Sequence, residues 1–166
     1  MGEVFVISDT HFGHHNIIKF DATRAFRPFA TIEEHDQELV RRWNNVVSNK
    51  DVVYHLGDVY FGQKNSVILG ELRGIKKLVL GNHDYYSLDI YKQYFSKIFG
   101  ATSFSEALLT HVPVHPTQLE HRFKMNIHGH MHASKLDDPR YVCVAVEHTG
   151  LAPIPMEQAL RQGSHK

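Results

Sequence analysis

Five short clusters of aspartate, histidine and asparagine carry the side chains of this chain that are best suited to chemistry. Carboxylate oxygens, amide oxygens and imidazole nitrogens, without any thiolate, suit Mn, Fe, Zn or Ni. In chain order the clusters contain Asp9 and His11; Asp58; Asn82, His83 and Asp84; His111; and His130 and His132. Together they offer enough nitrogen and oxygen ligands for two metal ions.

The first and last clusters share one spacing. Asp9 and His11 are two residues apart, as are His130 and His132. On an extended backbone, residues at this spacing point to the same side, so each pair could bind one ion. A polar strand end with an aspartate turn is the structural alternative for the first pair. Two closely spaced histidines after a strand are a recognised ligand pattern.

The middle clusters suggest different roles. Asp58 could bridge two cations through its two carboxylate oxygens, and Asn82 could supply a neutral oxygen. His83 could act on a substrate, with Asp84 holding its ring in one tautomer. Turns that begin a helix also favour Asn and Asp, and His111 alone could be an ordinary satisfied histidine. The combination of seven candidate ligands outweighs these separate alternatives.

Each cluster follows a short apolar run that predicts a β-strand. In open α/β sheets, ligands bind beyond the carboxyl ends of the strands. We therefore expect the clusters to meet at one edge of the fold. The predicted strands cover residues 4–7, 52–56, 78–80, 107–109, 125–127 and 141–146.

Helices are predicted between several of these strands, which indicates a layered α/β fold. Apolar residues at helical spacing predict a helix over about 32–48, and Thr31 and Glu34 form a capping box at its start. Two long loops are also expected. The other predicted helices cover about 65–73, about 87–95 and a segment from Pro155 to Gly163, and the loops cover 12–30 and 112–123.

Length and composition indicate one domain over residues 1–162 and a disordered tail at 163–166. Eighteen Lys and Arg balance 18 Asp and Glu, so the footprint of a dedicated nucleic-acid binder is missing. Cys143 is the single cysteine, which excludes an intrachain disulfide and a cysteine zinc cluster. The sequence shows no membrane span and no signal peptide, and a cytoplasmic location is expected.

The order of the clusters resembles the calcineurin-like metallophosphoesterases. The series D-x-H, G-D, G-N-H-D, H and G-H-x-H runs from Asp9 to His132, and all five blocks are intact. The stretch Ser8 to His14, with Asn16, looks like small bacterial and phage-type members. The resemblance implies a four-layer α/β/β/α sandwich, in which two facing mixed β-sheets are flanked by helices.

The resemblance also divides the ligands between two divalent ions. One ion would be bound by Asp9, His11, Asp58 and His132. The other would be bound by Asp58, Asn82, His111 and His130. His83 would be the catalytic acid or would stabilise the substrate, with Asp84 supporting it. Family habit favours Mn²⁺ and leaves Fe, Zn or Ni open.

The expected activity is hydrolysis of a small phosphate ester, which could be nucleotide-derived. Hydroxide bridging the two metals would attack phosphorus in line with the leaving group. The chain has little extra sequence for a lid, so an open site favours a diester over a monoester. His14, Asn16 and Arg27 are expected to contact the substrate, although a solvated loop, or an anchored turn at Arg27, is the alternative.

Three other functions stay open. A phosphomonoesterase or a nuclease could use the same site, although the neutral charge does not indicate strong binding to nucleic acid. A non-catalytic metal-binding scaffold is disfavoured because His83 and every ligand are present. The sequence does not indicate an oligomeric state.

Overall fold

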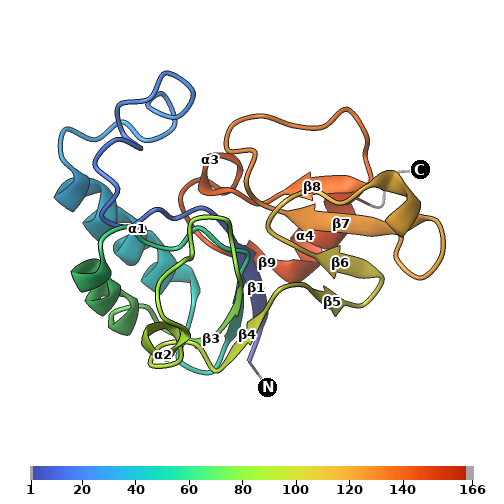
Figure 1. Ribbon diagram of the computed structural model, residues 1–166, viewed down its shortest axis with the longest axis horizontal. Helices are drawn as coiled ribbons and strands as arrows, with labels where there is room; N and C mark the ends of the chain where they lie inside the picture. The colour runs from blue at the N-terminus through green and yellow to red at the C-terminus, as the bar shows by residue number, and fades with distance from the viewer. Residues whose placement is uncertain (1, 164–166) are drawn as a thin grey trace.

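A computed structural model describes residues 2–163 and contains two β-sheets (Figure 1). The first sheet has five strands in the order β4-β3-β2-β1-β9. Strands β1 to β4 are parallel to their neighbours, and β9 is antiparallel to β1. Its strands are β1 (Val4–Ile7), β2 (Val52–His55), β3 (Ile75–Val79), β4 (Lys97–Phe99) and β9 (Ile154–Pro155).

The second sheet has four strands in the order β5-β6-β7-β8. Strands β6, β7 and β8 are parallel, and β5 pairs with β6 in the antiparallel sense. Its strands are β5 (Thr102–Phe104), β6 (Ala107–Leu109), β7 (Met125–His128) and β8 (Tyr141–Cys143). Two mixed sheets with flanking helices confirm the expected α/β fold.

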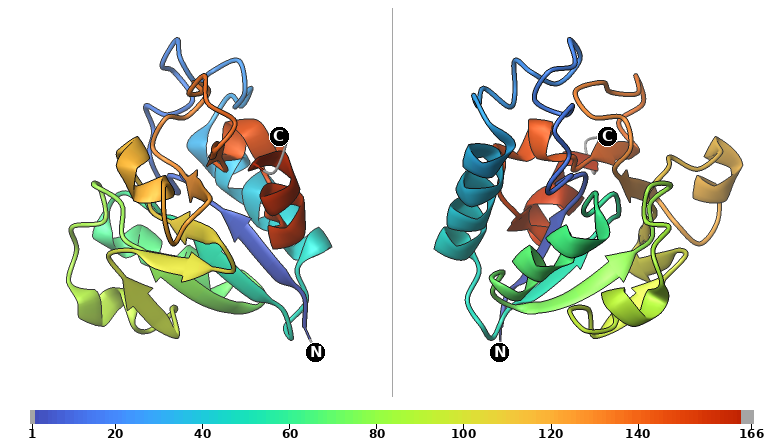
Figure 2. Two further views of the ribbon diagram at one scale, coloured as in Figure 1. Left: turned by 90° about the vertical axis from the view of Figure 1, so that its right-hand side faces the viewer. Right: turned by 60° about the vertical axis from the view of Figure 1, so that its left-hand side comes forward.

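Alternation along β1 divides the buried core into two clusters. Phe5 and Ile7 pack with Leu39 and Trp43 of α1 (Ile32–Val46), on the outer side of the first sheet. Val6 belongs to the second cluster, which also draws residues from β6, β7 and α4 (Met156–Gly163). Figure 2 shows α1 on the side of the first sheet away from the second sheet. The second cluster therefore joins the two sheets.

Helix α1 confirms the predicted helix and its start. Thr31 is the N-cap, and its hydroxyl accepts a hydrogen bond from the backbone N–H of Glu34 at 3.2 Å. The helix buries Leu39 and Trp43, whose indole N–H donates to the carbonyl of Arg73 at 2.9 Å. This anchor holds the helix against the segment that leads into β3.

Other predicted boundaries were wrong. The helix expected at 65–73 is a 3₁₀ helix, η1 (Gln63–Gly70), and the helix expected at 87–95 shortens to α2 (Leu88–Tyr91). Strand β8 ends at Cys143, so the predicted 141–146 strand was too long, and its last residue begins a short helix, α3 (Val146–Thr149). Within the predicted 112–123 loop lies a 3₁₀ turn, η2 (Pro116–Leu119).

The C-terminal prediction is partly corrected. Gly163, which we expected both at the end of the last helix and at the start of a tail, is the last residue of α4, whereas residues 164–166 lie outside the described part of the chain. Within residues 2–163, no helix has the length and apolar character needed to cross a membrane.

The two sheets converge where β1 and β8 end. The backbone N–H of Ser8 donates to the carbonyl of Val144 at 2.9 Å, and the N–H of Val146 donates to the carbonyl of Ser8 at 3.1 Å. These bonds form an isolated parallel bridge between Ser8 and Ala145. The loops that follow strands of both sheets are thereby brought to one place.

Candidate metal centre

The candidate ligands follow strand ends, but they do not sit on extended backbone. Five of them have positive φ angles, in the left-handed region that non-glycine residues seldom adopt. These are Asp9 (58°), His11 (51°), Asp58 (56°), His130 (67°) and His132 (48°). The extended-strand explanation of the two-residue spacing was therefore wrong, because the chain has already turned out of the strand. Residues held in such conformations often cluster at functional sites.

Asp9, His11 and His132 form the first cluster of possible metal ligands, each offering one atom within 4.8 Å of the others. The Nε2 atom of His11 lies 3.8 Å from Oδ1 of Asp9, and the Nε2 atom of His132 lies 3.9 Å from the same oxygen. Asp9 is fully buried, and its other oxygen accepts the backbone N–H of His130 at 2.9 Å. One carboxylate oxygen thus faces both rings.

Asp58, His111 and His130 form the second cluster. The Nε2 atom of His111 lies 3.3 Å from Oδ2 of Asp58. The side-chain oxygen of Asn82 lies 2.9 Å from Nε2 of His111 and 2.9 Å from Nδ1 of His130. The structure therefore brings Asn82 to this cluster, as the resemblance implied.

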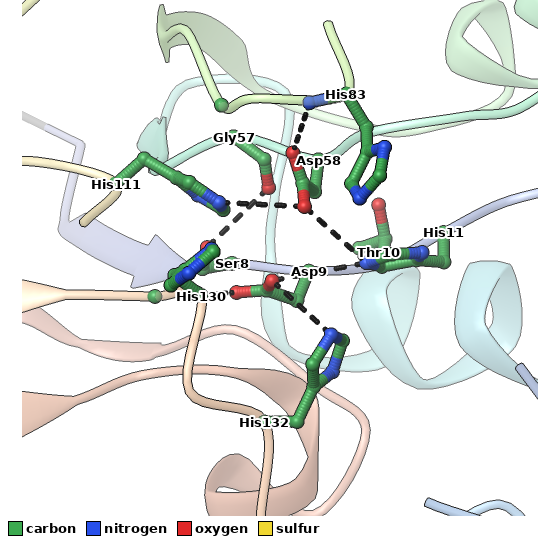
Figure 3. Close-up of polar contacts among 12 residues, drawn as sticks. Ser8, Asp9, Thr10, His11, Gly57, Asp58, His83, His111, His130 and His132 are labelled. Atoms are coloured by element: carbon green, nitrogen blue, oxygen red, sulfur yellow. Dashed lines mark hydrogen bonds and ion pairs between the residues drawn. The ribbon is translucent and has the colours of Figure 1, made fainter. Parts of the chain in front are cut away.

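Asp58 lies between the two clusters (Figure 3). Its Oδ2 atom is 3.6 Å from Nε2 of His11 and 3.3 Å from Nε2 of His111. Its Oδ1 atom accepts the backbone N–H of His83 at 2.9 Å, which fixes the carboxylate plane. The same oxygen thus faces one ring from each cluster, so a bridge between two ions would use this single oxygen instead of the two oxygens expected from the sequence.

Two buried atoms of the first cluster support a cation there. Within residues 2–163, Oδ1 of Asp9 and Nε2 of His11 have no hydrogen-bond partner. A buried polar atom without a hydrogen-bond partner destabilises the folded protein by about 1–3 kcal/mol. A divalent ion between the two atoms would remove that cost, and the oxygen and nitrogen donor set suits the ions favoured above. The residues present therefore fit two divalent ions.

Glycines let the backbone approach the carboxylates closely. A Cβ atom at Gly81 would collide with Oδ1 of Asp58, and one at Gly129 would collide with Oδ2 of Asp9. Larger residues at either position would displace a candidate ligand.

Three histidine rings are oriented through Nδ1, which leaves Nε2 facing the two carboxylates. The Nδ1–H of His111 donates to the carbonyl of Leu56 at 2.7 Å. The Nδ1 atom of His132 lies 3.1 Å from a carboxylate oxygen of Glu147, and Nδ1 of His11 lies 3.0 Å from Nδ1 of His14. Partners of this kind set the tautomer and orientation of metal-binding histidines.

The electrostatics of the site favour an ionised Asp9. Burial raises the pKa of this carboxyl, but the polar contact with His11 and the charges of nearby histidines outweigh burial and hold the pKa well below its usual range. Burial lowers the pKa of His111, and Asp58 and Asp9 overcome this effect and raise it to about 9. The carboxylates thus stabilise positive charge at the place where metal ions would bind.

The role expected of Asp84 is corrected. Its buried carboxylate accepts the backbone N–H groups of Asp58, Val59 and Gly81 at 2.7, 3.0 and 2.8 Å. It makes no contact with the His83 ring among the interactions of residues 2–163. Both oxygens are used by the backbone, so Asp84 ties the 81–84 turn to the end of β2.

The substrate contact expected of Arg27 was also wrong. Its guanidinium is fully buried and donates to the carbonyls of Asp9 at 2.6 Å and Thr10 at 3.0 Å. It also forms an ion pair with Glu147, at 2.8 Å. The anchored turn, which was the alternative explanation, is what the structure contains.

His83 and His14 lie beside the clusters without joining them. The centroid of the His83 ring is 6.1 Å from that of His11 and 5.1 Å from that of Phe61. His14 stacks on Phe61 with centroids 4.0 Å apart, and burial lowers its pKa to about 4. Asn16 is exposed, and its backbone carbonyl accepts from the N–H groups of two following residues.

Sequence reasoning missed Glu147 and His55. Glu147 is buried on α3, directly after the segment expected to be a strand, and no local pattern marks a contact 15 residues away. His55, the last residue of β2, is buried, and its Nε2 atom lies 2.9 Å from the hydroxyl of Thr10. Its place two residues before Gly57-Asp58 was the one available signal.

The fold and the paired ligand clusters define a class of proteins, the metal-dependent phosphoesterases. Within that class, the chain belongs to the calcineurin-like phosphoesterase family, whose family model matches residues 2–107. Residues 108–163 contribute β7, β8 and the three C-terminal candidate ligands.

Relatives from an archaeon and phages are similar to the chain. Uncharacterized protein MJ1445 of Methanocaldococcus jannaschii is 34% identical over 153 residues, which is 86% of this chain and 76% of that protein. Gene 66 protein of Mycobacterium phage L5 is 34% identical over 90 residues, covering 51% of this chain and 41% of the phage protein. The similarity to the archaeal protein extends beyond the region that the family model covers.

A solved structure has a similar fold throughout. The crystal structure of the protein of unknown function AQ665 from Aquifex aeolicus has a TM-score of 0.72 and 26% sequence identity. The alignment covers 97% of this chain and 99% of that one. The likeness therefore includes both sheets.

Proposed function

We propose that this chain is a dinuclear metal-dependent phosphodiesterase. The position of Asp58 carries the proposal, because one of its oxygens faces His11 of the first cluster and His111 of the second at 3.6 and 3.3 Å. Two ions held in this way would supply Lewis acidity and an activated water for phosphate-ester hydrolysis. Mn²⁺ is the favoured ion.

The residues around these ions have two proposed roles, to hold the ions and to act on the substrate. The buried carboxylates of Asp9 and Asp58 fix negative charge at the centre of the site. Their hydrogen bonds from backbone N–H groups hold them in place before any substrate binds. His83 is partly exposed beside them and is proposed to donate a proton to the leaving oxygen or to stabilise the phosphoryl group.

Exposure at one side of the site supports a diester substrate. Asn82 and His130 are exposed, although both belong to the second cluster. A site open on this side can accept a phosphate with a substituent on each of two oxygens. His14 and Asn16 stay candidate substrate contacts in this proposal, and Arg27 does not.

The diester assignment is tested by comparing two substrates at equal metal loading. Mn²⁺-loaded protein is assayed with bis(p-nitrophenyl) phosphate and with p-nitrophenyl phosphate, and kcat/KM is measured for each. The proposal expects the diester to have the larger value. A larger value for the monoester would show a phosphomonoesterase, and no hydrolysis of either would contradict a phosphoesterase. Short DNA and RNA at several salt concentrations extend the comparison to nuclease activity.

A further inference from the structure

His132 is held between two carboxylates on opposite sides of its ring. Its Nε2 atom lies 3.9 Å from Oδ1 of Asp9, and its Nδ1 atom lies 3.1 Å from Oε1 of Glu147. The side chain of His132 is 25% exposed, whereas the side chains of Asp9 and Glu147 are completely buried. The buried carboxylate of Glu147 is therefore the fixed partner, and the ring is the part that it can orient.

Glu147 is itself held by a buried arginine. The Nε and Nη2 atoms of Arg27 lie 2.9 and 2.8 Å from the same oxygen that faces His132. Because the guanidinium donates to this oxygen from two nitrogens, the carboxylate of Glu147 is held as a hydrogen-bond acceptor. The Nδ1 atom of His132 must then carry the proton that it shares with Glu147.

Arg27 also connects this carboxylate to the backbone of the first cluster. Its guanidinium donates to the carbonyls of Asp9 and Thr10 while it pairs with Glu147. The segment that follows β1 and the helix that follows β8 are thus joined through one guanidinium. The distance between Asp9 and His132 is set by this connection and by the Ser8–Ala145 bridge.

We propose that Glu147 is a positioning residue for His132 in the metal centre. By accepting from Nδ1–H, it fixes the tautomer whose Nε2 lone pair faces Asp9, and it holds the ring at that angle. The inference rests on the proposed metal centre and deepens it. No role for Glu147 follows from the ligand motifs, since it lies outside all five clusters.

The effect of Glu147 is confined to one of the two ions. In the second cluster, His111 is oriented by the neutral carbonyl of Leu56 at 2.7 Å, and Nδ1 of His130 faces Asn82. Neither ring contacts Glu147 or Arg27 among the interactions of residues 2–163. Loss of Glu147 should therefore weaken the ion at Asp9 and His11 and spare the ion at His111.

Nitrogen NMR of the wild-type protein tests the tautomer without any substitution at Glu147. Protein with ¹⁵N-labelled histidine is loaded with Zn²⁺, which is diamagnetic, and His132→Gln identifies the signals of His132. We expect His132 to carry its proton on Nδ1. A proton on Nε2 in the Zn²⁺-loaded protein would overturn the inference. If wild-type protein binds no Zn²⁺, the metal centre itself fails, and the inference fails with it.

Metal affinity tests the positioning role in solution. Equilibrium dialysis against Mn²⁺ alone is measured for wild type, Glu147→Ala and Glu147→Gln, each checked for folding by circular dichroism. We expect Glu147→Ala to weaken one ion by about 10–100-fold and to leave the other unchanged, as is usual for partners of metal-binding histidines. Glu147→Gln should recover part of the loss, because its amide oxygen can still accept from Nδ1–H.

The matched control removes a surface carboxylate of the same type. Glu157 is exposed on α4 and pairs with Arg161 at 3.1 Å, so Glu157→Gln should bind both ions with wild-type affinity. If folded Glu147→Ala also binds both ions as tightly as wild type, Glu147 is merely structural and the inference is overturned. Equal weakening of both ions would overturn it as well. If Glu147→Ala does not fold, the inference is tested by the metal affinity of Glu147→Gln and by the tautomer of His132 in the wild-type protein.

Discussion

Asp58 is the residue on which both halves of the proposed metal centre depend. One of its oxygens faces a ring from each cluster, and the other is fixed by the backbone N–H of His83. The positive φ of 56° at this residue turns the carboxylate toward both clusters directly after the Gly57 turn. No other residue among those described faces both His11 and His111 in this way.

Replacing Asp58 by Asn should weaken both ions. The change keeps the shape of the side chain but removes the charge that the two ions would share. We expect each affinity to fall by about tenfold or more, which corresponds to about 1.4 kcal/mol per ion. Bound Mn²⁺ per chain, measured after dialysis, checks this. Asp89→Asn, a change on the exposed part of α2, is the control, and selective loss of a single ion would contradict a shared ligand.

Replacing His83 by Ala should lower turnover without releasing metal. The ring lies beside the clusters, and only its backbone N–H contacts Asp58. Loss of general acid assistance typically lowers the rate by about 10²–10⁴-fold. The value of kcat and the metal content are measured on the same sample, with the exposed His121 replaced by Ala as control. Metal loss in His83→Ala would show that the histidine is a ligand instead.

At the residue scale, the sequence predicted which side chains come together, but it did not predict the backbone conformation that brings them together. The spacing of Asp9 and His11 suggested extended backbone, whereas both residues are left-handed. The burial of Arg27 and the turn around Asp84 depend on backbone groups that are distant in the chain, which no motif records. The division of ligands between two ions stays a prediction until metal binding is measured.

The element that follows β3 is the turn at residues 81–84, and Asp84 anchors it to the end of β2. Asp84→Asn would place an amide group against backbone N–H groups that now donate to a carboxylate. We expect a loss of about 1–3 kcal/mol in the free energy of unfolding, or roughly 2–12 °C in Tm. Thermal unfolding of metal-free protein measures it. An unchanged Tm with reduced turnover would instead indicate that Asp84 acts on His83, although the structure shows no contact between them.

The end of β2 contains a second buried group whose charge matters for stability. Burial lowers the pKa of His55 from 6.5 to about 3, and the neutral ring accepts the N–H of Gly57 at 3.1 Å. Below pH 6.5 the unfolded chain gains a proton at His55 that the folded chain does not take up, so this part of the stability is lost as pH falls. Relative to neutral pH, the free energy of unfolding is lowered by about 2 kcal/mol near pH 5 through this group.

Denaturant unfolding of metal-free protein at neutral pH and near pH 5 tests this dependence. The variant His55→Gln, which has no titrating ring, should lose about 2 kcal/mol less than wild type over the same interval. His121→Ala, which changes an exposed histidine, should follow wild type. Parallel pH profiles for wild type and His55→Gln would show that His55 is protonated equally in both states.

Prediction succeeded for the long helix α1 and for apolar strands such as β1 and β6, and it failed for several short elements without a clear pattern. Helix α1 has 15 residues and a clear capping box. Strands β4, β5 and β9 have three, three and two residues, too few for an alternation to be recognised. The 63–70 segment forms a 3₁₀ helix, begins after Gly62 without a side-chain cap, and leaves Val67 67% exposed.

At the scale of the whole molecule, the site exists because two sheets converge. The first sheet supplies Asp9, Asp58 and Asn82 from the ends of its strands, and the second supplies His111 and His130. The bridge between Ser8 and Ala145 joins the sheets beside the first ligand. The sequence indicated strand ends and the resemblance indicated two sheets, but this bridge and α3 arise only from tertiary packing.

The central claim is that two metal ions per chain are needed for diester hydrolysis. It is tested most directly by titrating metal-free protein with Mn²⁺ and measuring, on the same samples, bound ions per chain and the rate of bis(p-nitrophenyl) phosphate hydrolysis. We predict that hydrolysis follows the fraction of chains with two bound ions. Full activity without metal, or no activity at two bound ions per chain, would contradict the claim.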